Sequence, residues 1–578
     1  MRSILPALLL LLSTPDGPSP LRVDGTKILD RDGKEVRLRG VSLADPDALG
    51  AEYKREHFEL LAKSWKANAV RIPIHPGAWK AKGKERFDKL LDDGIEWCRE
   101  FGLYAIVDYH AIGNPKTGKA QKDKPEYDST MDLARAFWKH VAARYKAKPW
   151  VIFEVFNEPM QIGWEELRPI ATELVGLIRI AAPDSLVIVS GPDYTYDLRG
   201  PGAHPLEAKN LLYAWHVYPV RGTSWDSYTA EIRKKAPVIA TEWGYDLNGD
   251  PVTLGSTEAF GLPVLNFMEA QGIHWTAWCW HPQWGPPMLS GWGGAVTPFG
   301  RLARAWLAGD RPKARPSLKE VNDFTTWLRK VDLKALGDSK LDLCVIDPLK
   351  EGKELSRNEI DDLKWSFGGP KLVLAWLAIG DADEARPYWQ KEWSAKPPEW
   401  LGPGGKARFW DEKWQKIALD QLERIQAQGF DGAVLDGPAS WAYWQKKEKD
   451  DRAKPRMVEF VTRLSQAAKR RNKAFLVLPQ NGEELIENGA YQGAIDGVVR
   501  EDTYFSKSRQ YRANEIRDAE VLLEKAAAAG KKVLQIEYVT EEGHIEWVFE
   551  RSKSRGFVLY VGVKELDRLV VHKGHEPD

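Results

Sequence analysis

Two glutamates in the first half of the chain follow apolar runs that are typical of buried strands. Glu158 comes after VIFEVFN (151–157) and Glu242 after VIAT (238–241). Such runs suit a parallel sheet, and Pro159 has no N–H to donate to a ladder, so Glu158 is expected at the carboxyl end of its strand. One protonated carboxyl and one ionised carboxylate are what the hydrolysis of a glycosidic bond requires. Taken alone, Glu158 has the simpler reading of a cap on the next helix.

Six other residues that could position an acid or bind a sugar also stand at or near the ends of apolar runs. They are Arg71, His110, Asn157, His216, Tyr218 and Trp278. We expect Arg71 and Tyr218 to hold Glu242 ionised and oriented, since a cation and a hydroxyl donor both favour a charged carboxylate.

The remaining members of this set are expected to contact the substrate. Asn157 can bond the sugar 2-hydroxyl, an interaction that strengthens in the transition state. Trp278 can stack on the apolar face of a sugar, and Trp280 competes with it for this role. His110 and His216 are assigned to substrate binding, although a single buried histidine often only satisfies hydrogen bonds.

These residues need a scaffold that brings many strand ends together. Strands are predicted at 39–43, 68–74, 104–110, 151–158, 186–190, 211–218, 238–244 and 274–280, separated by amphipathic helices. This alternation predicts an α/β fold, a (β/α)8 TIM barrel whose strands end at one mouth. Across that mouth the fourth and seventh strands can bring two carboxyl groups to the roughly 5–5.5 Å of a retaining pair.

The stretch from Leu21 to Leu307 resembles glycoside hydrolase family 5, the cellulase-like retaining enzymes that use two glutamates. The resemblance is carried by VRIPI (70–74), DYH (108–110), FNEP (156–159), WHVY (215–218), TEWG (241–244) and WTAW (275–278). It implies that Glu158 is the acid/base and Glu242 the nucleophile of a retaining endo-β-1,4-glucanase-like enzyme. The loop HPQWGPP (281–287) would set the local specificity.

A second series of strands follows a Pro-rich and charged stretch, and acids again end several strands. The predicted strands end at Asp347 and at Gly380, followed by ARFWD (407–411) as a third, and continue through 430–437, 475–482, 496–502, 533–539 and 556–562. This predicts a second TIM barrel in tandem with the first. The acids expected at its mouth are Asp347, Asp381, Asp383, Asp436 and Glu501. They fit a hydrolase pair, a divalent-metal site without ligand-like spacing, or an inert barrel with solvated acids.

The stretch from Phe324 to Val571 resembles glycoside hydrolase family 114, the endo-α-1,4-polygalactosaminidase-like barrels. The resemblance is carried by LDLCVID (341–347), AIGDADEARPYW (378–389), FWDEKWQ (409–415), GFDGAVLDG (429–437), PQNGEEL (479–485) and REDTYF (500–505). It implies Asp436 as nucleophile and Glu501 as acid/base. Substrate binding is assigned to Asp347, Asp381, Asp383, Gln480 and Asn481. The family has Gly-Glu-x-Glu where this chain has Gly-Asp-Ala-Asp (380–383), and these shorter side chains would shift the contacts to substrate hydroxyls by about one methylene.

Composition narrows the class of partner. The 83 acidic and 83 basic residues leave no net charge, which argues against a nucleic-acid or anionic-membrane partner, and the 26 Trp suit carbohydrate binding. The three Cys, at 98, 279 and 344, form neither a disulfide framework nor a metal cluster. We assign no metal and no cofactor, and we expect a monomer.

The first 20 residues contain one Arg and an apolar run through Leu12, which resembles a signal peptide, with a retained membrane anchor as the alternative. We therefore divide the chain into a leader (1–20), a first barrel (21–308), a linker (309–322) and a second barrel (323–578), secreted or periplasmic. The predicted function is hydrolysis of β-glucan by the first barrel and of a galactosamine-containing exopolysaccharide by the second. The alternatives are a catalytic first barrel with a carbohydrate-binding second one, or a non-catalytic matrix protein.

Overall fold

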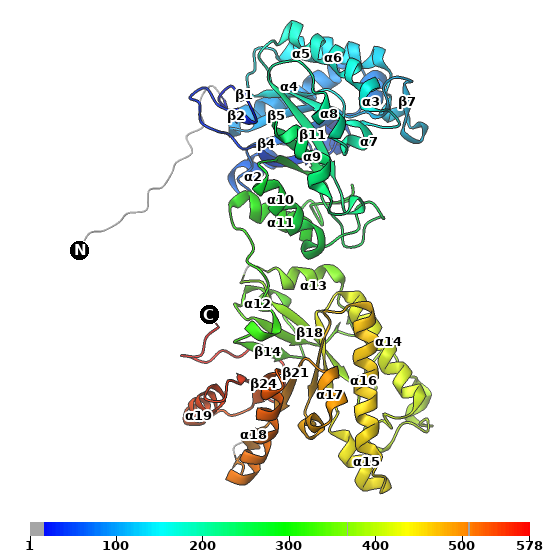
Figure 1. The fold of residues 1–578 in the computed structure, drawn as a ribbon, viewed down its shortest axis with the longest axis vertical. Helices are drawn as coiled ribbons and strands as arrows, with labels where there is room; N and C mark the ends of the chain where they lie inside the picture. Colours follow the sequence, from blue (N-terminus) through cyan, green and yellow to red (C-terminus); the bar gives the residue numbers. More distant parts are fainter. Residues whose placement is uncertain (1–16, 367, 507–508, 578) are drawn as a thin grey trace, which may run out of the picture. The chain divides into compact units, whose positions relative to one another are not determined.

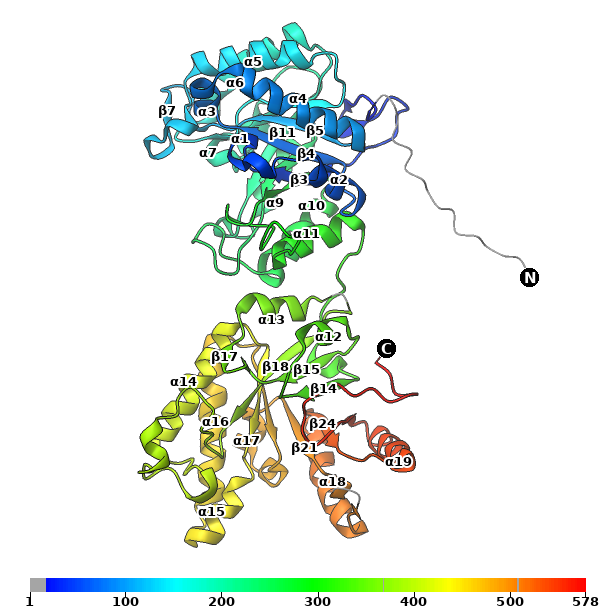
Figure 2. The same ribbon diagram turned by 180° about the vertical axis from the view of Figure 1, so that it is seen from behind.

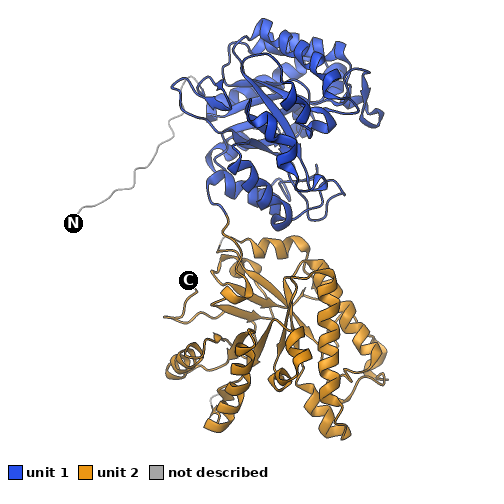
Figure 3. Cartoon of the chain, viewed as in Figure 1, with its two compact units in different colours: residues 1–311 blue, residues 312–578 orange. Residues whose placement is uncertain are grey.

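The computed structural model describes residues 17–366, 368–506 and 509–577. The expected leader lies largely outside the described residues. The chain forms two compact units, residues 1–311 and 312–578 (Figure 3). Among the described residues, no helix is long and apolar enough to cross a bilayer.

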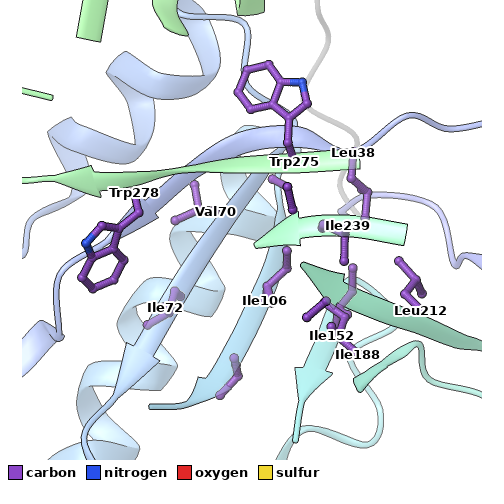
Figure 4. Close-up of a cluster of buried hydrophobic side chains, with 14 of the residues drawn as sticks. Leu38, Val70, Ile72, Ile106, Ile152, Ile188, Leu212, Ile239, Trp275 and Trp278 are labelled. Atoms are coloured by element: carbon purple, nitrogen blue, oxygen red, sulfur yellow. The ribbon is translucent and has the colours of Figure 1, made fainter. Parts of the chain in front are cut away.

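The first unit is a closed barrel of eight parallel strands. After a hairpin of β1 (Arg22–Asp24) and β2 (Lys27–Leu29), the barrel strands are β3 (Arg39–Leu43), β4 (Ala69–Ile74), β5 (Tyr104–Tyr109), β8 (Val151–Glu154), β10 (Val187–Ser190), β11 (Leu211–Val217), β12 (Val238–Trp243) and β13 (His274–Trp280). Every residue of β4 and β5 is buried, because helices cover the outside and packed side chains fill the inside. Figure 4 shows part of this core, including Ile106 and Ile152 of neighbouring strands.

Helices lie around the outside of this barrel (Figures 1 and 2). They are α1 (Pro46–Leu49), α2 (Arg55–Lys63), α3 (Pro76–Lys82), α4 (Lys84–Phe101), α5 (Met131–Tyr145), α6 (Trp164–Ala181), α7 (Pro192–Thr195), α8 (Arg199–Ala203), α9 (Trp225–Arg233), α10 (Leu262–Ala270) and α11 (Pro298–Ala308). Helix α4 buries Phe87, Leu91 and Ile95 at helical spacing. It ends at Gly102, whose φ of 71° is the left-handed conformation that glycine adopts without strain.

The second unit contains another sheet of eight parallel strands. In order, they are β14 (Phe324–Trp327), β15 (Leu343–Ile346), β18 (Leu372–Ala378), β19 (Gly432–Asp436), β20 (Leu476–Gln480), β21 (Gly497–Glu501), β24 (Lys532–Glu537) and β25 (Val558–Val561). The edge strands β14 and β25 adjoin, with the ring centroids of Phe324 and Tyr560 6.0 Å apart, so the barrel is nearly closed. The chain is thus two (β/α)8 TIM barrels in tandem.

The helices of the second unit flank its sheet (Figure 1). They are α12 (Leu333–Asp338), α13 (Arg357–Lys364), α14 (Glu412–Gln428), α15 (Ser440–Glu448), α16 (Ala453–Arg471), α17 (Gly489–Ala494), α18 (Ala513–Ala528) and α19 (Glu542–Lys553). Two short antiparallel pairs lie in the connections after β15 and β21, namely β16 (Leu349–Lys350) with β17 (Lys353–Glu354) and β22 (Phe505–Ser506) with β23 (Arg509–Gln510).

Two details of the strand prediction are wrong. The segment ARFWD (407–411) is not a strand but the end of the loop between β18 and α14, where Phe409 is buried in the core. The first strand of this sheet is instead the short FTTW of β14, so Asp436 and Glu501 still end the fourth and sixth strands. In the first unit, β8 ends at Glu154 and does not continue to Glu158. Glu158 belongs to a short strand β9 (Glu158–Pro159), which pairs with β6 (Ile112–Asn114) at the mouth. On its other side β6 pairs with β7 (Lys119–Ala120).

The segment between the units is short. Arg311 donates to Glu269 at 3.2 Å and lies over the ring of Trp306, so it belongs to the first unit. Arg315 donates to Asp431 at 2.7 Å in the second unit. Leu318 and Val321 are buried in the core of the second unit. Residues 312–314 therefore lie between the last contacts of one unit and the first contacts of the other.

Candidate active sites

Glu158 and Glu242 meet at the mouth of the first barrel. Glu242 lies in β12, and Glu158 reaches the mouth through β9. One carboxylate oxygen of each, together with a ring nitrogen of His216, lie within 4.8 Å of one another. This separation suits direct attack on a sugar rather than attack through an intervening water, which needs roughly 6.5–9.5 Å.

Glu242 is held by two donors. Nη1 of Arg71 donates to Oε1 at 2.9 Å, and the Tyr218 hydroxyl donates to Oε2 at 2.8 Å. The side chain is almost fully buried, so these bonds fix the orientation of its carboxylate. A cation and a hydroxyl donor both stabilise a carboxylate in its charged form.

Glu158 has the opposite surroundings. Burial raises its pKa from 4.5 to about 8, and the positive charge of Arg71 offsets only part of that effect. Its Oε1 lies 2.9 Å from Nδ1 of His216, whose own pKa burial lowers to about 4. Near neutral pH the carboxyl is therefore protonated beside a neutral imidazole. The two carboxyl groups in this mouth thus have different surroundings, one beside a neutral imidazole and the other held by a guanidinium and a hydroxyl.

Arg71 sits beneath the pair in a buried network of acids. Its guanidinium contacts Asp108 at 2.9 Å, Glu154 at 2.7 Å and Glu242 at 2.9 Å. Burial alone would lower the pKa of Arg71, but the three carboxylates outweigh it and raise that pKa. Burial raises the pKa of Asp108 to about 7 and also raises that of Glu154. Sequence reasoning missed Asp108 and Glu154. The glutamate inside the apolar run VIFEVF (151–156) was nevertheless an indication of a buried charge.

Asn157 and His110 lie where the sequence predicted. Asn157 Oδ1 accepts from Arg71 Nη2 at 2.6 Å, and its buried Nδ2 has no hydrogen-bond partner among the described residues. The His110 Nδ1 is 2.7 Å from Asp108 Oδ2, and burial lowers the pKa of His110 well below its ordinary value. His110 also stacks on Trp278, with ring centroids 5.2 Å apart and the planes 14° from parallel.

A cavity of about 700 Å³ opens over these groups. Its lining includes both glutamates, His110, Asn157, His216, Tyr218 and Trp278. It also includes Tyr127, Tyr194 and Trp284, which the sequence analysis did not assign. Another cavity, of about 810 Å³, lies by the hairpin and the starts of strands β8, β10 and β11, away from the acids. Because catalytic groups gather at the carboxyl ends of barrel strands, we place the candidate site in the cavity of about 700 Å³ that both glutamates line.

Trp280 does not belong to this site. Its side chain is 2 % exposed and packs edge-on against Trp65, with ring centroids 4.8 Å apart, and against His57. The register of β13 shifts between Trp278 and Trp280, so the simple alternation along the strand fails there. The expectation that Trp280 contacts the substrate is wrong, and of these two tryptophans Trp278 is the one that lines the cavity.

Asp436 is the last residue of β19 and Glu501 is the last residue of β21, and β20 lies between these two strands. Both acids therefore lie at the mouth of the second barrel. Glu501 accepts hydrogen bonds from Gln480 Nε2 at 2.9 Å and from the Tyr538 hydroxyl. Asn481 Oδ1 accepts from the backbone N of Glu501 at 3.1 Å and so fixes the end of the strand. Burial raises the pKa of Asp436 to about 7, and the nearby charges of Glu501 and Asp381 add to that effect.

The other acids of the second mouth are ion-paired. Asp347 forms two bonds of 2.7 Å with Arg386, which also lies 3.6 Å from Asp383. Asp381 pairs with Lys406 at 2.8 Å. Sequence reasoning missed both cations and Tyr538 because they stand in loops or directly after a strand, where no pattern marks them.

The described residues contain one group whose atoms converge as metal ligands would, namely Glu158, His216 and Glu242. Arg71 and Tyr218 already occupy both oxygens of Glu242, and the guanidinium charge repels a cation. The donor set fits acid and base chemistry better than metal binding. In the second mouth, Asp347, Asp381 and Asp383 are paired with basic residues, which argues against a metal site there as well.

Comparison with known proteins identifies both halves. Residues 29–283 match the cellulase family, glycosyl hydrolase family 5, and residues 309–576 match glycoside-hydrolase family GH114. Over 299 residues the chain is 30% identical to an uncharacterized protein of Deinococcus radiodurans, covering 50% of this chain and 94% of that protein.

Endoglucanase E-5 of Thermobifida fusca is 28% identical over 271 residues, covering 45% of this chain and 55% of that enzyme. Among solved structures, β-glucanase SdGluc5_26A of Saccharophagus degradans matches with 28% identity and a TM-score of 0.49, covering 53% of this chain and 98% of that one. Both family matches are to glycoside hydrolases. The chain is a glycoside hydrolase that joins a family 5 domain to a family 114 domain.

Proposed function

We propose that the first barrel cleaves β-1,4-linked glucan with retention of configuration, using Glu158 as acid/base and Glu242 as nucleophile. The observation that carries this proposal is the opposite environment of two carboxyl groups whose oxygens approach within 4.8 Å. One is protonated by burial, and the other is held by a guanidinium and a hydroxyl. Relatives named endoglucanase support a β-glucan as the substrate.

In the first step, Glu158 gives its proton to the leaving glycosidic oxygen while a Glu242 oxygen attacks the anomeric carbon. The resulting glycosyl-enzyme is then hydrolysed by water, whose proton returns to Glu158. Asn157 Nδ2 is buried at the mouth, has no hydrogen-bond partner among the described residues, and supplies a donor for the sugar 2-hydroxyl. Trp278 offers a face on which the sugar stacks.

For the second barrel we propose hydrolysis of an α-1,4-linked galactosamine-containing polymer by Asp436 and Glu501. The match of residues 309–576 to family GH114 and the two acids that end the fourth and sixth strands support this activity. Both substrates are polymers too large to enter a cell. We therefore also propose that the protein acts outside the cytoplasm.

The test is a substrate panel assayed with the full chain. Reducing-sugar release is measured on cellulose, mixed-linkage glucan, xyloglucan, mannan and partly deacetylated α-1,4-galactosaminan. Glu242→Gln should abolish release from the β-glucan alone, and Asp436→Asn release from the galactosaminan alone. Release of sugar from none of these polymers would overturn the proposed activities. Release from β-glucan alone would leave the second barrel as a binding module.

A further inference from the structure

We propose that Asp502 and the ring of Tyr538 form a binding site for the ammonium group of an amino sugar, and that the side chain of Lys564 competes with the sugar for this site. The inference rests on the proposed hydrolase function of the second barrel. It deepens that function by naming the side chains that distinguish an amino sugar from its N-acetylated form.

The ammonium group of Lys564 has two partners in the structure. Lys564 belongs to the segment after β25, and its Nζ lies over the Tyr538 ring, 4.1 Å from the centroid. The same Nζ donates to Oδ2 of Asp502 at 3.0 Å. An aromatic face and a carboxylate each attract a cation. Neither contact requires the ammonium group to come from a lysine, so the protonated amine of a sugar fits the same place.

This site adjoins the carboxyl group of Glu501. The Tyr538 hydroxyl donates a hydrogen bond to Oε1 of Glu501, and Asp502 directly follows Glu501 in the chain. In a 2-amino sugar the amine is bonded to the carbon next to the anomeric carbon. A sugar whose anomeric carbon lies beside Glu501 can therefore bring its amine to Asp502.

The backbone holds Asp502 in an uncommon conformation. Its φ of 49° lies in the left-handed region, which few residues other than glycine adopt. Its N–H donates to the Ile536 carbonyl at 3.0 Å. The next two backbone N–H groups, of Thr503 and Tyr504, donate to the buried Glu537 carboxyl at 2.7 and 2.9 Å. These contacts fix the turn, and backbone conformations of this kind cluster at functional sites.

Lys564 is held less firmly than Arg386, a second cation of this mouth. The Lys564 side chain is 61 % exposed and makes one ion pair, with Asp502. Arg386 also lies over an aromatic ring, that of Trp376, but its side chain is 14 % exposed and makes two bonds of 2.7 Å with Asp347. An exposed ion pair contributes little free energy, because both ions are well solvated when they separate. A substrate amine can therefore displace Lys564 more readily than Arg386.

The charges of the mouth also favour a cationic ligand. Its carboxyl groups outnumber the basic residues that pair with them. The acids are Asp347, Asp381, Asp383, Asp436, Glu501 and Asp502, and their basic partners are Arg386, Lys406 and Lys564. An excess of one sign of charge in a cleft raises the local concentration of ligands of the opposite sign. N-acetylation removes the charge of an amino sugar, so this mouth should bind the free amine in preference.

Binding of oligosaccharides tests the site without hydrolysis. The full-length Asp436→Asn variant serves as the parent, because it should not cleave the ligand. Isothermal titration calorimetry compares an α-1,4-linked galactosamine pentasaccharide with the same pentasaccharide in its fully N-acetylated form. Adding Asp502→Asn should weaken binding of the free-amine form about 10–100-fold, as loss of a hydrogen bond between charged groups does. Binding of the N-acetylated form should not change.

Substitutions of Lys564 test the competition. Lys564→Met keeps an apolar side chain on the Tyr538 ring and removes the ammonium group. It should tighten binding of the free-amine pentasaccharide about 2–5-fold, because no exposed ion pair has to be broken. Lys564→Arg keeps a cation and should bind as the parent does. The matched control Lys416→Met removes an exposed lysine that pairs with Asp420 at 2.8 Å within α14, and it should leave both affinities unchanged.

The choice of cleaved bonds gives a second measurement, made with Asp436 intact. Partly deacetylated galactosaminan is digested with the full-length chain, and mass spectrometry identifies the sugar on each side of every cleaved bond. The wild-type chain should require galactosamine on one side. Asp502→Asn should accept N-acetylgalactosamine there about as often as the polymer contains it. Near-UV circular dichroism checks that each variant is folded.

The outcomes separate this site from the proposed activity. Unchanged binding of the free-amine form in Asp502→Asn, or an equal loss of both forms, would overturn the ammonium site. Weaker binding of both forms in Lys564→Met would show that the lysine only positions Tyr538, and an unchanged affinity would refute the competition. Binding that depends on Asp502 and Lys564 as expected, without cleavage of any α-linked polymer, supports the site and overturns the hydrolase function instead.

Discussion

His216 Nδ1 lies 2.9 Å from Glu158 Oε1, and the other ring nitrogen lies 3.0 Å from the hydroxyl of Thr241. Burial keeps the imidazole neutral, so Nδ1 can accept a hydrogen bond from the protonated Glu158 when the ring hydrogen is on Nε2, beside the Thr241 hydroxyl. The histidine therefore orients the acid without competing for its charge. We therefore expect the protonation of Glu158 to control the pH dependence of activity in the first barrel.

We expect the β-glucanase activity to fall as pH rises through about 8. The folded pKa of Glu158 is raised above 4.5, so the acid is present below about 8 and lost above it. The measurement is kcat/KM against pH on an unactivated cello-oligosaccharide. A dinitrophenyl β-cellobioside, which needs no acid, should lack this alkaline limb. A limb near the ordinary 4.5 of a glutamic acid would contradict the assignment.

Glu158→Gln and Glu242→Gln should separate the two roles. Glu158→Gln should cost about 10²–10⁴-fold on unactivated substrates and spare the first step with a dinitrophenyl leaving group. Glu242→Gln should remove activity on both, because no nucleophile remains. Proton NMR of the first product from wild type should show the β-anomer, as retention requires. An α-anomer would rule out the retaining pair.

Arg71→Met should destabilise the first unit by about 3–5 kcal/mol, because it leaves Asp108, Glu154 and Glu242 buried without their cation. Chemical denaturation followed by near-UV circular dichroism measures this cost. Adding Glu154→Gln removes one of the stranded charges, so the double variant should be more stable than Arg71→Met alone. If the double variant loses stability additively, the acids are not coupled through Arg71.

The apolar runs predicted most strands because parallel barrel strands are buried on both faces. All eight strands of the first barrel lie within a few residues of the predicted ranges. The prediction failed where an apolar run was buried for another reason. Phe409 packs into the core from a loop, and the short FTTW of β14 contains two threonines, so hydropathy favoured the wrong segment.

The site was predicted less completely than the fold. Residues at strand ends, such as Arg71 and Trp278, could be inferred because a barrel brings those ends together. Partners supplied by loops, such as Arg386 and Lys406, have no periodic pattern. Trp280 was misplaced because one register shift changes which face of the strand a side chain occupies.

Trp278 and Trp280 should respond differently to truncation. Trp278→Ala removes the sugar platform, so we expect kcat/KM to fall about 10–100-fold, since each tenfold corresponds to about 1.4 kcal/mol. Trp280→Ala leaves a hole beside Trp65, so it should cost about 3–5 kcal/mol of stability. Michaelis kinetics and denaturant unfolding on both variants test the contrast. A larger kinetic than stability effect for Trp280→Ala would contradict its exclusion from the site.

The position of the cut between the units decides whether the second barrel is stable alone. Fragments 1–311 and 312–578 should each unfold cooperatively, because the first keeps Arg311 on Trp306 and the second keeps Leu318 and Val321 in its core. Fragment 322–578 lacks both apolar side chains and should be less stable by about 1.5–3 kcal/mol for each. Urea unfolding of the three fragments measures the difference. Equal stability of 312–578 and 322–578 would show that residues 312–321 form a linker rather than part of the barrel.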